Sequence, residues 1–298
     1  MSETPQADRG DQPTLRLALP KGRMQRGVFE LLDEAGVKIR SSSRGYRPAI
    51  SLPDFEAKIL KPQNIVEMLG HGSRDLGFAG ADWVAELEID LVELVDTGLD
   101  PVQLVAAAPR ELLEKTDGQL PDRPLVVASE YQRLTRSWID DRGLDAVCVR
   151  SYGATEVFPP EDADFITDLT QTGATLQANG LVVLDELHRS STRLYANPAA
   201  MEDSAKRERM ESFALVIRSV LAARKRVLVE VNVSAENLDA VIEVLPVMRE
   251  ATMSPLHGGG GYAVKAAVPV EQLPQVIPEI KRRGGSDVVV TKLVQIVP

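Results

Sequence analysis

The chain has 298 residues, of which 44% are hydrophobic and 4% aromatic, and its formal net charge is −10. This length can hold one large domain or two to three ordinary ones. The acidic balance and the scarcity of aromatic rings argue against a nucleic-acid-binding protein. A mean hydropathy of −0.11, without any apolar run of roughly 18 residues, argues against a membrane partner.

Two features bear on the cellular compartment. Residues 1–13 are polar and lack the apolar segment of a signal peptide, so we interpret them as a disordered tail. Cys148 is the only cysteine, which excludes an internal disulfide and agrees with a cytoplasmic location. Its setting in "AVCV" predicts a small buried strand residue.

The first part of the chain alternates between strand and helix patterns. A strand is predicted at "TLRLALP" (Thr14–Pro20), followed by a helix whose apolar face runs from Val28 to Ala35 and ends at Gly36. Strand-like "KILKP", helical "QNIVEMLGHG", a β stretch in "DLGFAGADW" and two β segments at residues 89–96 and 102–109 come next. This alternation predicts an α/β sheet that is largely parallel.

A second series follows the stretch "EKTDGQLPDRP", which we interpret as a crossing between lobes. It contains the strand "PLVVASE", the helix "YQRLTRSWIDDRG", the strand "AVCVRS" and a short buried strand that ends at Asp168. The segment "STRLYANPAAM" then predicts a strand that returns to the first lobe. We therefore expect two α/β lobes with a cleft, like periplasmic binding proteins, made of residues 14–110 with 190–225 and of residues 111–189.

The last part of the chain contains an internal repeat. "AENLDAVIEVL" and "VEQLPQVIPEI" align without gaps, and in each the apolar positions share one helix face. Alternating valines from Val227 to Val233 precede the first helix, and "YAVKAAV" precedes the second. With "ATMSPLH" and "DVVVTKLVQIV" as further strands, residues 226–298 are predicted to form a ferredoxin-like βαββαβ domain.

The clearest candidate site lies around Asp168. Ligands of open α/β folds lie beyond the carboxyl ends of strands, and the turn from Thr172 to Thr175 could direct N–H groups and hydroxyls at a phosphate. Asp168 could accept hydrogen bonds from sugar hydroxyls. An acid followed by T-G-x-T therefore suggests a ribose 5-phosphate site, although an ordinary turn with a threonine N-cap fits the spacing equally well.

Other candidates are basic or small residues. Lys21 and Arg23 stand at a helix N-terminus, where cations are unfavourable unless an anion joins them. Arg44 and Arg47 could clamp a pyrophosphate, or could simply be solvated. The glycines of "DLGFAGADW" allow either close approach of a ligand or tight packing.

Several catalytic classes are excluded. The three histidines, His71, His188 and His257, are scattered, and no spacing suggests a protein-bound zinc. A G-x-S-x-G hydrolase motif and a GxxxxGK[ST] nucleotide-binding loop are both lacking.

Three motifs resemble those of the ATP phosphoribosyltransferases, the first enzymes of histidine biosynthesis. They are "LALPKGRM", "DLGFAGADW" and above all "ADFITDLTQTGATLQANGL". The resemblance extends from about Leu15 to Pro298. The C-terminal repeat is similar to the regulatory domain of the long form, which implies that a separate regulatory subunit is unnecessary.

The resemblance implies a reaction and a set of site residues. N1 of the adenine of ATP would be joined to C1 of phosphoribosyl pyrophosphate, and pyrophosphate would leave, with Mg²⁺ present. The resemblance assigns phosphoribosyl pyrophosphate to Asp168, Thr172, Gly173, Ala174, Thr175 and Leu176, and ATP or pyrophosphate to Lys21, Gly22, Arg23, Arg44, Arg47, Gly80 and Asp82. It assigns neither a nucleophile nor a protein ligand of the metal. Met24, where leucine is usual, and Thr170, where valine is common, are small departures.

For the C-terminal domain, the resemblance implies feedback inhibition by histidine and a homo-oligomer, either a dimer or a hexamer. Thr252 and Ser254 fall in the segment that lines the histidine site of relatives. The glycine run in "HGGGGY" departs from many relatives and predicts a loose loop. His257 in this loop is expected to be exposed rather than to contact the inhibitor.

Three alternatives remain at this point. Solute-binding proteins share a two-lobed cleft, but they are usually secreted and need no phosphate loop. Nucleobase phosphoribosyltransferases typically place two adjacent acidic residues before that loop, whereas Thr167 precedes Asp168 here. A regulator that has lost catalysis would have little reason to retain "LPKGR" and "TGAT".

Overall fold

The computed structural model describes residues 13–40, 45–114, 121–246, 248 and 250–297. The chain divides into two compact units: one comprises the chain up to Glu30 with Val37–Glu211, and the other comprises Leu31–Gly36 with the chain from Ser212 onward. The predicted disordered tail, apart from Pro13, lies outside the described residues. Arg44 also lies outside them.

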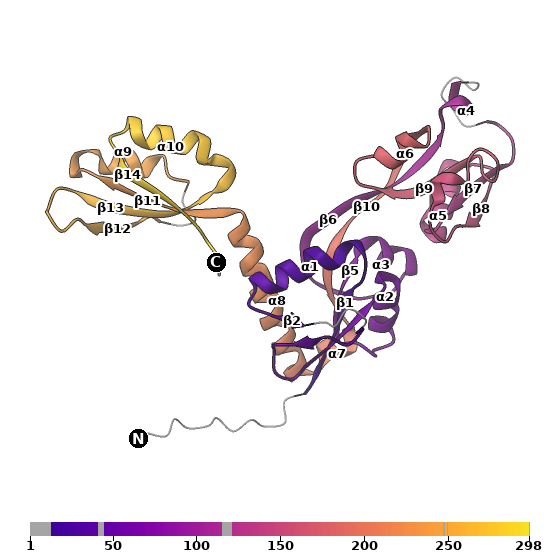
Figure 1. Ribbon diagram of the computed structural model, residues 1–298, viewed down its shortest axis with the longest axis horizontal. Helices are drawn as coiled ribbons and strands as arrows, with labels where there is room; N and C mark the ends of the chain where they lie inside the picture. The colour runs from indigo at the N-terminus through magenta and orange to yellow at the C-terminus, as the bar shows by residue number, and fades with distance from the viewer. Residues whose placement is uncertain (1–12, 41–44, 115–120, 247, 249, 298) are drawn as a thin grey trace. The chain divides into compact units, whose positions relative to one another are not determined.

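The first unit is built on an eight-stranded sheet with the order β4-β1-β5-β10-β6-β9-β7-β8 (Figure 1). Its strands are β1 (Leu15–Pro20), β4 (Phe55–Leu60), β5 (Leu76–Gly80), β6 (Val92–Pro109), β7 (Leu125–Ser129), β8 (Ala146–Arg150), β9 (Phe165–Thr170) and β10 (Leu181–Ala196). A small two-stranded sheet is formed by β2 (Ile39–Arg40) and β3 (Ala49–Ile50).

The helices of this unit follow the strands along the chain. They are the first part of α1 (Arg23–Glu34), α2 (Pro62–Gly70), α3 (Ala81–Leu87), α4 (Arg110–Glu114), α5 (Gln132–Arg142), α6 (Ala174–Ala178), α7 (Pro198–Glu202) and the first part of α8 (Ser204–Arg224). A 3₁₀ turn, η1, spans Thr155–Val157. The predicted helices at residues 23–35 and 63–72 are confirmed within a few residues.

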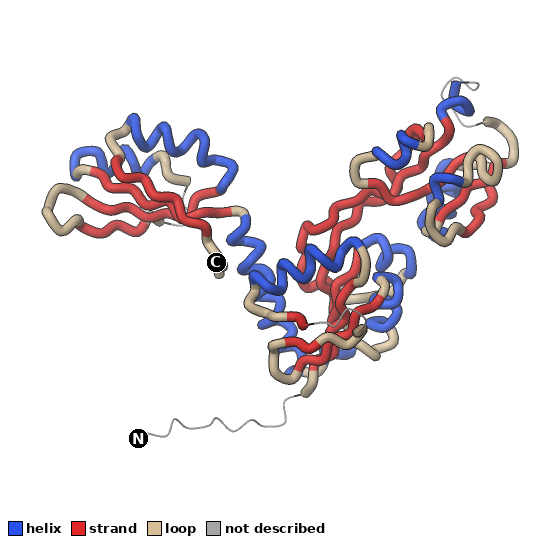
Figure 2. The backbone as a smooth tube through the Cα atoms, viewed as in Figure 1, coloured by secondary structure: helices blue, strands red, loops and turns tan. Residues whose placement is uncertain are grey.

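Two long strands join the halves of the large sheet. β6 and β10 pair antiparallel from Leu181 opposite Pro109 to Ala196 opposite Val92, and they run as one ribbon through the middle of the unit in Figure 2. The outer strands β4, β1 and β5 are mutually parallel, as are β9, β7 and β8. The prediction of a largely parallel sheet is therefore right for the two halves and wrong for the centre.

The length of the central strands was underestimated from the sequence. The two β segments predicted at residues 89–96 and 102–109 are one strand, β6, because Gly98 and Asp100 take left-handed φ angles of 64° and 47° and keep the chain in an irregular ladder. The returning strand β10 begins at Leu181, well before the predicted "STRLYANPAAM". The two halves are thus joined along β6 and β10. The stretch "EKTDGQLPDRP", predicted as a crossing between lobes, lies mostly outside the described residues, so that prediction stays open.

The second unit contains the end of α8 and the predicted βαββαβ domain. Its elements are β11 (Arg226–Val233), α9 (Leu238–Glu243), β12 (Thr252–Pro255), β13 (Tyr262–Pro269), α10 (Leu273–Arg282) and β14 (Ser286–Lys292). The antiparallel order β12-β13-β11-β14 is that of a ferredoxin-like sheet. The expected two-lobed α/β core with a ferredoxin-like domain is thus confirmed.

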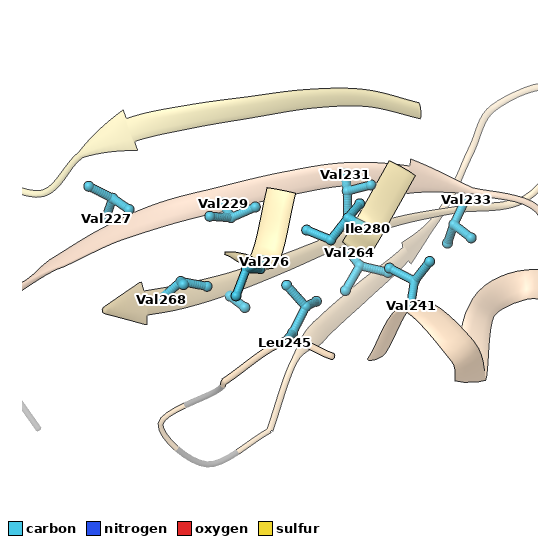
Figure 3. Packing of buried hydrophobic residues seen from close by; sticks show 11 residues of the cluster. Val227, Val229, Val231, Val233, Val241, Leu245, Val264, Val268, Val276 and Ile280 are labelled. Carbon is cyan, nitrogen blue, oxygen red and sulfur yellow. The ribbon is translucent and has the colours of Figure 1, made fainter. Parts of the chain in front are cut away.

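The internal repeat forms the core of this second unit. Val227, Val229, Val231 and Val233 are buried at alternate positions of β11, and the equivalent helix residues Val241 and Val276 pack against them (Figure 3). Each helix follows a short 3₁₀ turn, Ala235–Asn237 in the first copy and Val270–Gln272 in the second. The repeat therefore extends from sequence to backbone conformation.

Candidate active site

A cavity of about 110 Å³ lies at the carboxyl ends of β1 and β5. The first half of the sheet, the two long strands and the second half all contribute to its wall. Its lining residues are Lys21, Arg23, Met24, Pro62, Gly80, Asp82, Trp83, Asp100, Val102, Tyr131, Leu169, Ser190, Ser191 and Thr192. Four predicted site residues, Lys21, Arg23, Gly80 and Asp82, are brought together here.

The cations of the cavity lie on the predicted turn between β1 and α1. Gly22 makes this turn with a φ of 85°, which places Lys21 and Arg23 on either side of it. The Nζ of Lys21 donates to the Oη of Tyr46 at 3.1 Å and lies 4.9 Å from the centre of that ring. Among the residues that the structure describes, neither Lys21 nor Arg23 forms an ion pair, so both can still neutralise an anion.

Asp82 is the buried acid of the cavity. It lies in the first turn of α3 and is only 4% exposed. Its Oδ1 accepts a hydrogen bond from the hydroxyl of Ser190 at 2.5 Å, and its Oδ2 accepts one from the hydroxyl of Tyr131 at 2.6 Å. Its carboxylate is therefore held in one orientation by two neutral donors.

The glycines before Asp82 are explained by packing. A Cβ on Gly77 would lie 2.8 Å from Ile65 and 2.9 Å from Ala18, and a Cβ on Gly80 would lie 2.1 Å from the Oδ1 of Asp82. Of the two explanations that the sequence allowed, tight packing therefore accounts for both residues. Gly80 contributes to the cavity by leaving room for the Asp82 carboxylate.

Tyr131 was not anticipated from the sequence. It lies just before α5, in the second half of the sheet, yet it is 3% exposed, and its ring stacks on Trp83 of α3 at a centroid distance of 4.6 Å. Burial, and then the neighbouring Asp82 charge, raises the pKa of its hydroxyl, which therefore remains a donor. Ser190, Asp100 and Thr192 were also missed, because no local motif marks them.

Asp168 lies on β9 beside the cavity, and its neighbour Leu169 is part of the wall. The strand does not end at Asp168, as predicted, but continues to Thr170, because residues through Thr170 keep pairing with β6. The half-buried side chain accepts a hydrogen bond from the N–H of Leu169 at 2.7 Å. Burial, assisted by the charges of Glu156 and Glu130, raises the pKa of Asp168 to about 6.

The turn after β9 has the predicted backbone. Gly173 takes a φ of 75° and forms the N-cap of α6, so the alternative of a threonine N-cap is wrong. The N–H of Gly173 donates to the Oγ1 of Thr170 at 2.8 Å. Thr170, which stands where valine is common in the family, thus helps to close the turn. Thr172, Ala174 and Thr175 are exposed.

Leu176 has a different position from the rest of this turn. Its side chain is buried in the core with Ile166 and Leu181, so only its backbone N–H could face a ligand. The N–H groups in the first turn of a helix lack acceptors within the helix. The predicted contact of Leu176 with a ligand could therefore be made only by its backbone N–H group.

The remaining predicted residues lie elsewhere. Arg47 is exposed and does not line the cavity, and its charge contributes to lowering the pKa of Arg74. Thr252 and Ser254 are exposed on the edge strand β12 of the second unit. His257 is exposed, as expected, whereas Cys148 is on a strand but only half-buried.

Comparison with known proteins decides the family. A family model described as ATP phosphoribosyltransferase matches residues 61–219, and one described as HisG, C-terminal domain, matches residues 223–295. An ATP phosphoribosyltransferase of Pelotomaculum thermopropionicum is 34% identical over 95% of this chain and 99% of its own length. Another, of Desulforudis audaxviator, is 35% identical over the same shares. The chain belongs to the ATP phosphoribosyltransferase family.

A solved structure agrees with this membership. The ATP phosphoribosyl transferase (HisG:HisZ) complex from Thermotoga maritima contains a chain that matches with a TM-score of 0.62 and 27% identity. The match covers 70% of this chain and 99% of that chain. As a member of the ATP phosphoribosyltransferase family, the protein is a pentosyltransferase of histidine biosynthesis.

Two further observations concern metal ligands and membrane-spanning helices. Within the described ranges, no group of three or more histidine, cysteine, aspartate or glutamate side chains could hold a metal ion. Two carboxylates, Asp82 and Asp100, do line the cavity, and Asp100 accepts a hydrogen bond from Thr192 at 3.1 Å. Among the described residues, no helix is both long enough and apolar enough to span a membrane.

Proposed function

We propose that the protein transfers the phosphoribosyl group of phosphoribosyl pyrophosphate to N1 of the adenine of ATP. The bond from C1 to N1 forms as the bond from C1 to the pyrophosphate oxygen breaks, and the electron pair leaves on pyrophosphate. The observation that carries this proposal is the cavity in which two cations, Lys21 and Arg23, adjoin the strand that bears Asp168. Neither cation has an ion-pair partner in the part of the chain that the structure describes.

The side chains of the site suit a displacement that proceeds without a protein nucleophile. Such a reaction passes through an oxocarbenium-like state and depends on positioning and on neutralising the leaving group. Lys21 and Arg23 would attract phosphate oxygens and stabilise the departing pyrophosphate. Gly22 would allow the substrate to approach the backbone.

Asp168 and the following turn would hold the ribose phosphate. With a pKa of about 6, the Asp168 carboxylate is mostly ionised at neutral pH and can accept hydrogen bonds from the ribose hydroxyls. The hydroxyls of Thr172 and Thr175, with N–H groups of the turn, would bind the 5-phosphate. Leu176 would contribute its backbone N–H.

Mg²⁺ fits this site as an ion that arrives with the substrates. Magnesium is usually held by one or two carboxylates together with substrate phosphates, and Asp100 and Asp82 are the carboxylates that the cavity offers. When bound, the ion would neutralise phosphate charge beside Lys21 and Arg23.

We also propose that histidine inhibits the enzyme through its C-terminal domain. Residues 223–295 match the C-terminal domain described for HisG, and Thr252 and Ser254 are accessible on its edge strand. This domain would serve regulation within the chain itself, and a separate regulatory subunit would then be unnecessary. A hexameric assembly in the cytoplasm completes the proposal.

The test is pyrophosphate release by the purified protein with ATP, Mg²⁺ and phosphoribosyl pyrophosphate, with and without histidine. We expect release that needs both substrates and decreases with histidine. Release that is insensitive to histidine would retain the reaction and contradict the regulatory proposal. Absence of release, with histidine still bound, would favour a non-catalytic sensor.

A further inference from the structure

Tyr131 connects the two halves of the large sheet at the cavity. It follows β7 and precedes α5, which belong to the second half, but its side chain packs in the hydrophobic cluster that contains Trp83 and Leu69 of the first half. Its hydroxyl crosses to α3 and donates to Asp82. The contact therefore joins the half that bears Lys21 and Arg23 to the half that bears Asp168.

Asp82 depends on this contact for its orientation. In the described part of the chain no lysine or arginine forms an ion pair with it, so its charge is stabilised by the hydroxyls of Tyr131 and Ser190 and by its surroundings. A hydrogen bond to a buried charged group is stronger than one between neutral groups. Loss of the Tyr131 hydroxyl would leave one carboxylate oxygen without its donor.

The backbone of Tyr131 is fixed from the side of Asp168. The N–H of Tyr131 donates to the Oγ of Ser129 at 3.0 Å, and the Oγ of Ser129 accepts from the Oγ1 of Thr167 at 2.6 Å. The carbonyl of Tyr131 accepts from the Oγ1 of Thr135 at 2.5 Å. Ser129, Thr135 and Thr167 are fully buried, and Thr167 immediately precedes Asp168. A continuous set of hydrogen bonds thus runs from the strand of Asp168 to Asp82.

A second contact between the same elements supports this connection. The carboxylate of Glu86, one turn after Asp82 on α3, accepts from the N–H groups of Arg133 and Leu134 at 2.9 Å and 3.0 Å. These groups belong to the first turn of α5. The loop of Tyr131 therefore cannot shift relative to α3 without breaking both contacts.

We infer that Tyr131 is a positioning residue that orients Asp82 and couples the binding of the two substrates. This inference rests on the proposed function. A substrate bound at Asp168 would further stabilise the hydrogen bonds that hold the Tyr131 backbone, and Tyr131 orients the Asp82 carboxylate, which lines the cavity with Lys21 and Arg23. Each substrate consequently binds better when the other is present.

The test is Tyr131→Phe in the full-length protein, which removes the hydroxyl and keeps the ring on Trp83. The matched control is Tyr195→Phe, because Tyr195 is 4% exposed, belongs to the same hydrophobic cluster and does not line the cavity. Initial rates over a grid of both substrate concentrations give KM and kcat. Titration of the tryptophan fluorescence with ATP, with and without phosphoribosyl pyrophosphate, measures nucleotide binding independently of turnover, and thermal unfolding measures stability.

We expect Tyr131→Phe to raise the KM for ATP about tenfold, with a smaller change in kcat. We also expect it to abolish the dependence of ATP affinity on phosphoribosyl pyrophosphate, while Tyr195→Phe preserves that dependence. If the two variants have equal KM values and equal coupling, the inference is wrong and the proposed reaction stands. If the unaltered protein neither binds ATP nor releases pyrophosphate, the proposed function fails and the inference fails with it.

Discussion

Lys21 and Arg23 carry charges that no ion pair neutralises among the described residues. They line the cavity at the start of α1, where the helix dipole disfavours cations. Arg26, one turn further along the same helix, is 87% exposed and pairs with Glu30. Substitutions at these three residues can therefore distinguish a role in substrate binding from a general effect of positive charge on activity.

We expect Lys21→Ala and Arg23→Ala each to lower kcat/KM by about 10- to 100-fold, since each would lose a charged hydrogen bond to phosphate. The melting temperature should stay within about 2 °C, because both side chains are exposed. Arg26→Ala should leave kcat/KM unchanged. Normal turnover in both of the first two variants would refute their assignment to the site.

Asp168 gives the enzyme a pH dependence of defined sign. Its raised pKa means that the folded protein binds the proton more tightly than the unfolded chain does, so this residue lowers stability as pH rises from 3.8 to about 6. In the proposed reaction, the ionised carboxylate would accept hydrogen bonds from the ribose hydroxyls more strongly than the protonated form. We expect the KM for phosphoribosyl pyrophosphate to increase as pH falls below about 6.

The variant Asp168→Asn isolates this effect from titration of the substrate phosphates. Its KM should exceed that of the unaltered protein about tenfold at pH 7.5, and the difference should narrow below pH 6. Steady-state kinetics between pH 5 and 8 measure both. A constant ratio across this range would show that Asp168 does not titrate in the binding step.

At the scale of residues, the sequence predicted the site residues that belong to local motifs. Lys21, Asp82 and Asp168 each lie in a short motif near the carboxyl end of a strand. Tyr131 and Ser190 were missed because their contacts with Asp82 span 49 and 108 residues. A hydroxyl that acts by such a distant contact leaves no local pattern.

At the scale of elements, Glu86 links α3 to α5 by taking the place of an N-cap. Its buried carboxylate accepts the N–H groups of Arg133 and Leu134, which have no acceptor within α5. In Glu86→Gln, an NH₂ group would replace one of the two carboxylate oxygens that accept these hydrogen bonds. We expect the free energy of unfolding to fall by about 1–2 kcal/mol.

Urea denaturation measures this change, and Glu211→Gln on the exposed surface of α8 is the control, expected to remain within about 0.5 kcal/mol. If both substitutions lower the free energy of unfolding equally, the hydrogen bonds of Glu86 add no stability beyond the effect of its charge.

Periodicity predicted the elements whose burial follows a simple rule. The alternation of β11 and the apolar face of α1 were both read from the sequence and confirmed. The central strands were not, because the bulges at Gly98 and Asp100 interrupt the alternation of β6. The pairing of β10 with β5 depends on residues far apart in the chain, about which local patterns carry no information.

At the scale of the whole molecule, the exposed threonine and serine of β12 should affect inhibition alone. We expect Thr252→Ala with Ser254→Ala to raise the histidine concentration for half-inhibition about tenfold, since two hydroxyl donors are lost, with KM and kcat unchanged. Thr291→Ala, on the opposite edge strand β14, is the control. Unchanged inhibition in the double variant would exclude these two side chains from the histidine site.

The antiparallel pairing of β10 with β5 has a consequence for synthesis of the protein. Gly80 pairs with Thr192, so β5 waits for a partner that the ribosome delivers roughly a hundred residues later. At about 5–20 residues per second, this delay lasts roughly 6–22 seconds. During that interval one edge of β5 is unpaired, and the nascent chain offers chaperones an apolar strand. Stalling of translation between these two strands should therefore increase aggregation more than stalling after β10.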